Sequence, residues 1–173
     1  MKFRTNILTG GVLLFLFLTL IFATCKYSTH DTAPIPPEVK TFRVNYFENK
    51  ARYVNPQIMP QVTEMEKQKI IGETRLQQTN NDDAHYDISG YLSDYSVTTT
   101  GINGQTASTN RLNVTFHLIF KNNLDHTKDQ EADVTSNYDF SANLTLPEAE
   151  SGLLSSIEKN ITDAVFNKIF SNW

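Results

Sequence analysis

The chain has one cysteine among its 173 residues, Cys25, so a disulfide within the chain is excluded. It also has little positive charge, because 15 Lys and Arg stand against 19 Asp and Glu and leave a formal net charge of −4. A general nucleic-acid binder needs a basic face, so we expect no nucleic-acid partner.

Motifs of enzymes and metal sites are missing as well. The four histidines lie far apart and show none of the His or Cys spacings typical of zinc ligands. No Gly-x-Ser-x-Gly elbow, phosphate-binding loop or dinucleotide fingerprint occurs. We therefore expect a protein that is not an enzyme, with no catalytic residue, no metal and no cofactor.

What is present begins with a secretory signal layout in residues 1–24. Lys2 and Arg4 precede an apolar stretch over residues 12–23 that only Thr19 interrupts. This stretch is short for a spanning helix of about 20 residues, although counting from Ile7 reaches the lower limit. A cleaved signal peptide is the main interpretation, and an uncleaved anchor is the alternative.

Cys25 directly follows this stretch and the small residues Ala23 and Thr24. The segment resembles a bacterial lipobox, which implies that Cys25 becomes the lipidated first residue of the mature chain. Phe22 and Thr24 depart from the usual Leu and Gly, Ala or Ser of that pattern. Diacylglycerol and an N-linked acyl chain supply the two hydrophobic signals that stable anchoring requires. The alternative is a plain cleavable signal that a cysteine happens to follow.

Removal of residues 1–24 leaves 149 residues, enough for one domain with a single core. Lys2 and Arg4 leave with the signal, so the mature net charge becomes −6. Residues 25–38 hold the lipidated cysteine and a polar stretch with three prolines, which predicts a flexible tether. We expect the folded domain over residues 39–173.

The first half of this domain predicts a strand and a helix. Residues 41–47 alternate, with Phe42, Val44 and Tyr46 on one side, as in a half-buried strand. A helical pattern follows to about Gly72, and its regular part is expected to begin near Pro60, because proline is unfavourable beyond the first turn.

Three strands and a long helix are predicted in the second half. The strand at 85–97 changes phase across Gly90, which predicts a bulge there. The polar run 98–110 reads as a connection, and 121–133 as a charged hairpin loop between strands at 111–120 and 134–144. Thr145 and Glu148 form a capping box before a helix whose apolar stripe continues to the end of the chain.

The element order β-α-β-β-β-α predicts an α+β two-layer sandwich, a four-stranded mixed sheet with two helices on one face. The other face is left open and polar. It is expected to carry Arg43, Asn45, Arg111, Asn113, Thr115 and His117. Solvent or an enclosing partner would each explain such a face.

Several segments in series resemble the LptE family of outer-membrane lipopolysaccharide-assembly lipoproteins. They are PPEVKTFRVNYFENKARYVNPQI, ETRLQ, ISGYLSDYSV, NRLNVTFHLIFKN and the terminal VFNKIFSNW, spread over residues 36–173. The resemblance implies a lipid-anchored, non-enzymatic plug on the periplasmic side of the outer membrane, inside the lumen of an LptD-type β-barrel. It implies that the plug helps the barrel fold and takes part in delivering lipopolysaccharide to the outer leaflet.

Lipopolysaccharide carries phosphates, which arginine binds with two parallel hydrogen bonds. We expect the first two strands to run parallel, and this would place Lys50 and Arg52 at the same sheet edge as Arg111, with Arg43 facing the same side. These four residues are the candidate lipopolysaccharide contacts. The alternative function is a periplasmic lipoprotein that binds lipid or another ligand without a barrel.

Overall fold

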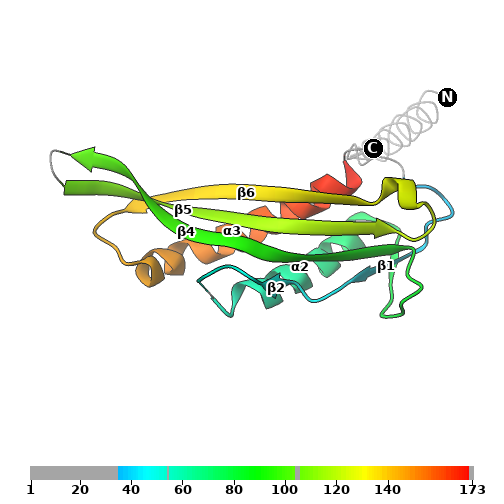
Figure 1. Ribbon diagram of the computed structural model, residues 1–173. Helices are drawn as coiled ribbons and strands as arrows, with labels where there is room; N and C mark the ends of the chain where they lie inside the picture. Colours follow the sequence, from blue (N-terminus) through cyan, green and yellow to red (C-terminus); the bar gives the residue numbers. More distant parts are fainter. Residues whose placement is uncertain (1–34, 54, 104–105, 172–173) are drawn as a thin grey trace, which may run out of the picture. The chain divides into compact units, whose positions relative to one another are not determined.

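The computed structural model describes residues 35–53, 55–103 and 106–171, which form one sheet with two helices on one of its faces (Figure 1). Cys25 and the preceding signal segment lie outside the described residues. The elements in chain order are β1 (Thr41–Val44), β2 (Glu48–Asn49), α2 (Ile58–Glu73), β3 (Gln77–Gln78), β4 (Tyr86–Asn103), β5 (Thr106–Asn122), the 3₁₀ turn η2 (His126–Lys128), β6 (Gln130–Ser141) and α3 (Leu146–Phe170).

The strands are ordered β3-β1-β4-β5-β6, and β2 pairs with β4 on the same side as β1. β1 and β2 run parallel to β4, whereas β4, β5 and β6 form an antiparallel meander. The α+β class and the mixed sheet are therefore confirmed. The expected parallel pairing of the first strand with the strand after the helix is also confirmed, as β1 with β4. The sheet has six strands rather than four because β2 and β3, each two residues long, join its edge.

The hairpin of β4 and β5 is much longer than the sequence suggested. β4 continues to Asn103 and β5 begins at Thr106, so the expected connection over 98–110 is wrong. This run is rich in Thr, Ser and Asn and poor in apolar residues, yet backbone pairing across the hairpin satisfies its polar groups without a core. β6 likewise begins at Gln130, inside the stretch expected to be a loop.

Two details of the strands also differ from expectation. The register shift of β4 nearest to Gly90 lies between Leu92 and Asp94, whereas Gly90 pairs in register with Leu118, so the bulge at Gly90 is wrong. Tyr46 is 63% exposed rather than buried. β1 ends at Val44, and Phe47 takes the core position instead, its N–H donating to Thr63 Oγ1 at 3.0 Å.

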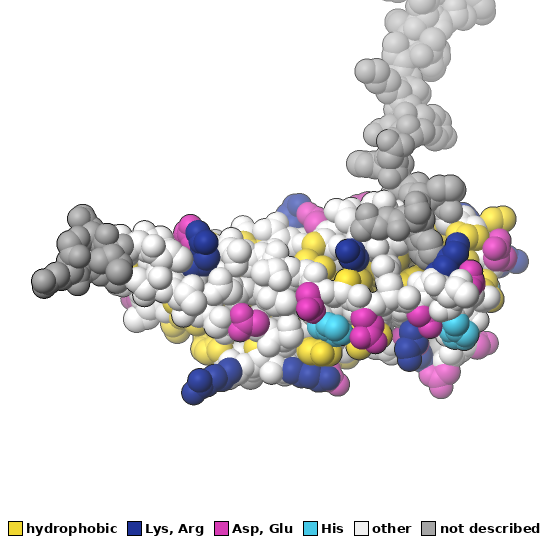
Figure 2. All heavy atoms as spheres, turned by 45° about the horizontal axis from the view of Figure 1, so that its top comes forward, with side chains coloured by type: hydrophobic (Ala, Val, Ile, Leu, Met, Phe, Trp, Pro, Cys, Tyr) yellow, Lys and Arg dark blue, Asp and Glu magenta, His cyan; other side chains and the backbone are white. Residues whose placement is uncertain are grey.

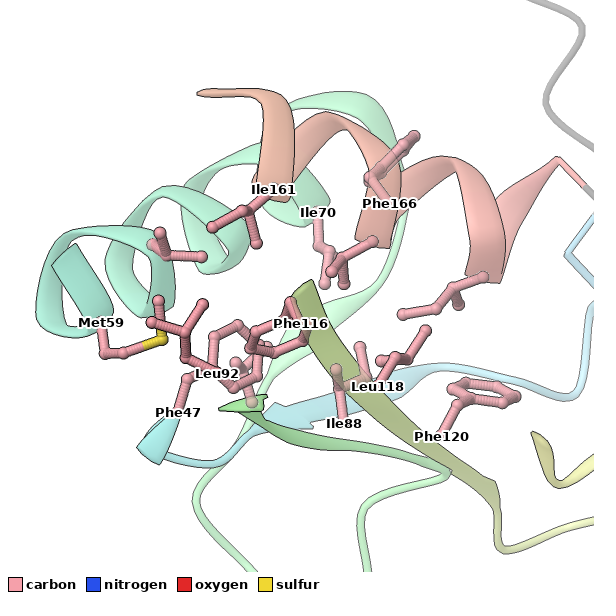
Figure 3. Close-up of a cluster of buried hydrophobic side chains, with 14 of the residues drawn as sticks. Phe47, Met59, Ile70, Ile88, Leu92, Phe116, Leu118, Phe120, Ile161 and Phe166 are labelled. Carbon is pink, nitrogen blue, oxygen red and sulfur yellow. The ribbon is translucent and has the colours of Figure 1, made fainter. Parts of the chain in front are cut away.

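The core lies between the helices and one face of the sheet. β5 supplies every second residue from Leu112 to Phe120, and all five of these side chains are at most 1% exposed. Each large apolar side chain buried in this way contributes about 1.5–3 kcal/mol before entropy is subtracted. Figure 3 shows the side chains of α2, α3 and the strands converging around Phe116.

The start of each helix is marked by a residue pattern that suits a first turn, a proline in α2 and a capping box in α3. α2 starts at Ile58, which places Pro60 in the first turn, where backbone N–H groups have no helical partner and proline is tolerated. The expected start at Pro60 is thus two residues late. The capping box of α3 is confirmed, because Thr145 N donates to Glu148 Oε2 at 2.8 Å.

Gly90 marks a place where the core leaves no room for a side chain. A Cβ atom added there would lie 2.5 Å from the carbonyl oxygen of His117 and 2.5 Å from Cζ of Phe116. The ring of Phe116 therefore packs directly over this backbone position, and a methyl group would displace both the ring and the strand pairing.

We predict that Gly90→Ala lowers the free energy of unfolding by about 1–3 kcal/mol, the usual range for overpacking. Gly152→Ala is the matched control, because this exposed position in α3 has nothing within 4 Å of an added Cβ and gains helix propensity, about 1 kcal/mol. Urea unfolding of both variants measures the difference. Equal stabilities would show that Phe116 does not pack on Gly90 as described.

α2 carries a buried carboxylate that has no hydrogen-bond partner among the described residues. Glu66 is 0% exposed, and neither of its carboxylate oxygens has a hydrogen-bond partner among the described residues. Burial raises the pKa of Glu66 well above its ordinary value, Lys69 opposes this shift, and Asp163 of α3 and Glu73 of α2 reinforce it. The folded state therefore holds the proton of Glu66 more tightly than the unfolded chain does.

It follows that Glu66 reduces stability as the pH rises from the ordinary pKa of glutamate towards the raised value. We predict that Glu66→Gln is more stable than the wild type at about pH 8, by about 1–3 kcal/mol, and gains less at about pH 4.5. Urea unfolding at the two pH values measures this. Glu64→Gln, at an exposed position of the same helix, should show no such gain, and a pH-independent gain would contradict the assignment.

Candidate functional site

The open face of the sheet is a surface of paired polar side chains from β4, β5 and β6. It is built by strand alternation, because residues next to each core residue point away from the helices. Asn113 is flanked by Ser96 and Asn137, and Thr115 by Asp94 and Thr135. The placement expected for the open face, including Arg43 and His117, is confirmed by this register.

Neutral hydrogen bonds run across the strands on this face. The hydroxyl oxygens of Thr115 and Thr135 lie 3.2 Å apart, and Asn113 Nδ2 donates to Thr98 Oγ1 at 3.3 Å. The turned view in Figure 2 shows mostly white surface, with basic and acidic side chains scattered in small mixed groups. Such a surface can exchange hydrogen bonds with water or with another polar wall without desolvating a charge.

Arg111 is held by a carboxylate at one end of the face. Its Nε and Nη2 donate to the two carboxylate oxygens of Asp139 at 2.6 and 2.9 Å. This pair lowers the pKa of Asp139 and raises that of Arg111. Arg111 remains 41% exposed, so its charge is accessible although two of its guanidinium nitrogens donate to Asp139.

His117 stands at the centre of a second group. Its Nδ1 lies 2.7 Å from Asp133 Oδ1, and its Nε2 lies 3.6 Å from Glu131 Oε2. The ring of Tyr91 lies 4.9 Å from the imidazole, and Lys50 Nζ sits 4.0 Å over the ring of Tyr91. A cation, two rings and two carboxylates thus form a continuous row across the sheet.

Arg43 is the most enclosed of the candidate cations. Its side chain is 19% exposed and forms ion pairs with Asp82 and Asp87, of which Asp87 also accepts from Asn45. Asp87 contributes most to the raised pKa of Arg43. Arg43 Nε is buried without a hydrogen-bond partner among the described residues. This arginine ties β1 to β4 and to the turn that precedes β4.

The structure does not bring the four candidate cations together. Arg43 pairs with Asp87 of β4 and Arg111 with Thr98, eleven residues further along that strand, which corresponds to roughly 35 Å. Lys50 N donates to Leu92 O, six residues from Thr98 and so roughly 20 Å from Arg111.

The expectation that Lys50 and Arg52 share a sheet edge with Arg111 is therefore wrong. The reason is the register along β4, because the end of β2 and Lys50 lie opposite Leu92, whereas Arg111 pairs with Thr98 six residues further along that strand. Lys50 and Arg52 do remain neighbours in one exposed segment.

Sequence reasoning missed the acidic partners Glu131, Asp133 and Asp139. They lie in a stretch that read partly as a loop, and their alternation becomes meaningful only once β6 is aligned with β5. All three acids stand at odd positions, so they fall on one face of a strand, and this shared parity was the signal that could have identified them.

A groove lies on the helix side, between α2 and α3. Its volume is about 550 Å³ and its lining is mostly carbon. The lining includes Gln61, Met65, Lys69, Ser155, Thr162 and Asp163. Lys69 Nζ and Asp163 Oδ1, 2.7 Å apart, link the two helices at the groove.

Two further kinds of feature are absent from the described part of the chain. No three His, Cys, Asp or Glu side chains gather there as a metal site. Within the same residues, no helix has the length and apolar character to cross a membrane.

A known protein family matches most of the chain. The family model LptE, described as lipopolysaccharide-assembly, matches residues 39–169. No curated protein gives a significant match.

Among solved structures, the chain is similar to rare lipoprotein B from Shewanella oneidensis, with 8% identity, 73% of this chain and 92% of that chain covered, and a TM-score of 0.49. It is also similar to a PelC dodecamer from Paraburkholderia phytofirmans, with 14% identity, 80% of this chain and 92% of that chain covered, and a TM-score of 0.45. A minor lipoprotein from Acinetobacter baumannii shows 16% identity, with 78% of this chain and 96% of that chain covered, and a TM-score of 0.41. The functional argument therefore rests on the family match.

Proposed function

We propose that this chain, which belongs to the LptE family of lipopolysaccharide-assembly proteins, is a lipid-anchored plug and assembly factor for an LptD-type outer-membrane β-barrel. In this proposal the barrel delivers lipopolysaccharide to the outer leaflet, and the chain has a binding role rather than a catalytic one. The observation that supports it is the open sheet face, whose hydroxyl, amide and paired charged groups suit contact with another polar surface.

A protein that fills a barrel lumen has to match the chemistry of the lumen wall. The interior of an outer-membrane barrel is polar, so a plug needs an exterior that can hydrogen-bond rather than an apolar one. Isolated charges would lose hydration in such a contact, and the two arginines of the face, Arg43 and Arg111, are each paired with a carboxylate. The face therefore combines polarity with a low cost of desolvation.

Cys25 is the proposed site of attachment to the membrane. Two acyl signals on one cysteine would hold the domain at the periplasmic side of the outer membrane through residues 26–34. Anchoring would keep the domain beside the barrel while the barrel folds. The partner, the anchor and the location are thus parts of one proposal.

We predict that the tagged chain co-purifies with a β-barrel of much greater mass from detergent-solubilised outer membrane. Asn113→Lys with Thr115→Lys should reduce the barrel recovered severalfold, because two unpaired charges on the open face would be desolvated in the contact. Gln61→Lys with Gln68→Lys, at exposed positions of α2, is the charge-matched control on the other layer. The barrel is quantified by mass spectrometry of the eluate.

Equal loss of the barrel in both double variants would show that the sheet face is not the contact. Recovery of a freely diffusing monomer with an unmodified amino terminus would contradict the whole proposal. Circular dichroism of each variant confirms that it is folded before the comparison is made.

Arg43, Lys50, Arg52 and Arg111 are the proposed contacts for the phosphates of lipopolysaccharide. They fall into two pairs that differ in their exposure and in their present partners. Lys50 and Arg52 are exposed and two residues apart, and Lys50 has only an exposed ion pair with Glu48 at 3.3 Å. Arg43 and Arg111 lie far apart, and each would have to leave a carboxylate to bind the ligand. A ligand that meets all four must therefore be extended along the sheet.

We predict that Lys50→Ala with Arg52→Ala, and Arg43→Ala with Arg111→Ala, each weaken binding of detergent-dispersed lipopolysaccharide severalfold at fixed salt. Lys67→Ala with Lys168→Ala removes the same charge from the helices, away from the groove lining, and should change binding little. Equal weakening in all three would show that binding follows net charge alone. Arg43→Ala also removes the partner of Asp87, so its urea unfolding must be measured beside its binding.

The groove between α2 and α3 favours a second candidate function. Its volume of about 550 Å³ and its mostly carbon lining suit a small apolar ligand. The alternative is a periplasmic lipoprotein that binds lipid or another ligand without a barrel. A monodisperse monomer that binds lipid unaided would favour this alternative over the plug.

A further inference from the structure

The sheet has two edges of very different kind. One edge is β3, which is two residues long, and beyond Leu92 this edge continues along β4, whose pairing with β5 contains three register shifts. The other is β6, whose twelve residues pair with β5 without any register shift and with no second strand among the described residues. In Figure 1 β6 forms one long margin of the sheet, while α3 crosses the sheet on the helix side. A long regular edge presents a row of backbone groups that can pair with another strand.

β6 lacks several of the usual protections of an edge strand, although it carries three acidic side chains. Its sequence QEADVTSNYDFS contains no proline, glycine or lysine, and its pairing contains no bulge. Soluble proteins commonly use such devices to prevent strand addition. The opposite edge is interrupted by the shortness of β3 and by the register shifts of β4, so among the described strands only β6 offers a long regular edge.

The direction of the free backbone groups follows from the antiparallel pattern. Asn123 N donates to His85 O and Ala142 N donates to Ser108 O, and both pairs continue the strand registers. Odd residues of β5 therefore bond to β4, and even residues of β5 and β6 bond to each other. The odd residues of β6, from Glu131 to Asp139, direct their N–H and C=O groups to the free edge.

Side chains on the two sides of this edge differ in chemistry. On the open face the side chains of Glu131, Asp133 and Asp139 are 67%, 63% and 49% exposed, and one arginine and one histidine of β5 lie beside these three carboxylates. On the helix side the half-buried residues include Val134, Tyr138 and Phe140. The edge is thus acidic on one side and largely apolar on the other.

Self-pairing of β6 does not match this pattern. A two-fold antiparallel pairing of two copies, centred on Thr135, sets Glu131 of one copy opposite Asp139 of the other, and does so twice. Like charges directly opposite each other destabilise a strand pair. A strand with basic residues at alternate positions and apolar residues between them instead complements both sides of the edge.

We propose that the free edge of β6 is a strand-addition site for an extended segment of a partner protein that alternates Lys or Arg with apolar residues. Main-chain hydrogen bonds to the odd residues supply the pairing, and the three carboxylates select the basic side of the segment. This surface is a strand edge and not the sheet face assigned above, so a negative result here leaves the proposed function untouched.

Hydrogen–deuterium exchange with a synthetic probe tests the proposal on the unmodified protein. The probe is the peptide Val-Lys-Val-Arg-Val-Lys-Val, and the control has Glu in place of each basic residue. In the free protein, the amides of the odd residues of β6 should exchange faster than those of the even residues. The basic peptide should slow exchange at Asp133, Thr135 and Asn137 at least tenfold, and the acidic peptide should not.

Two variants separate backbone pairing from charge attraction, with fluorescence anisotropy of the labelled peptide as the readout. Thr135→Pro removes an outward N–H without removing a bond to β5, and should weaken binding roughly tenfold. Thr135→Val keeps the N–H and should bind like the wild type. A peptide methylated at alternate backbone nitrogens provides the same test on the wild-type protein, should Thr135→Pro disturb the fold.

Unchanged binding of the methylated peptide, or unchanged exchange at the odd amides, would overturn the proposal. A dimer in sedimentation that Thr135→Pro abolishes would show that a second copy occupies the edge instead. Co-purification of the barrel is measured separately, so failure of the edge and failure of the proposed function remain distinguishable.

Discussion

The pairing of β5 with β4 and β6 is the constraint on which the other features of this domain depend. Because side chains alternate along a strand, one register decides at once which residues enter the core and which reach the open face. Leu112, Val114, Phe116, Leu118 and Phe120 are buried on one side of β5, and the residues between them are all polar except Ile119. A slip of one residue would exchange the two sets, which makes the register strongly specified.

The helices follow from this arrangement. α2 and α3 cover the apolar side of the meander, and the aromatic residues that close the core come from both layers (Figure 3). Tyr95 and Tyr53 donate to the two carboxylate oxygens of Glu150 at 2.5 and 3.2 Å, which ties β4 and the segment after β2 to α3. Burial raises the pKa of Tyr95, so its hydroxyl stays a donor to the carboxylate. The polar contacts inside the fold are thus few and directional.

The open face and the free edge serve different kinds of contact. On the face, Arg43 and Arg111 are each matched with a carboxylate, which suits a broad polar interface without a single dominant charge. At the edge of β6, the backbone groups of the odd residues point outwards, and the acidic side chains of the same strand lie on the adjoining part of the face, which suits an extended segment. One sheet therefore provides two surfaces whose recognition rests on different physics.

The sequence by itself determined the two-layer class, the capping box of α3, the alternation of β5 and the polar character of the open face. These depend on local spacing, and local spacing can be read without knowing which elements meet. It also pointed to the LptE family through the order of segments, which the match over residues 39–169 confirms.

Only the tertiary structure decided the length of the β4–β5 hairpin, the position of the register shift beside Ser93, and the separation of Arg43 from Arg111. It also decided which carboxylate each cation meets, and that β6 is left with one neighbour. The physical reason is that strand length and register are set by pairing across the sheet. A polar run such as residues 98–110 carries no sign of its partner until the two backbones lie side by side.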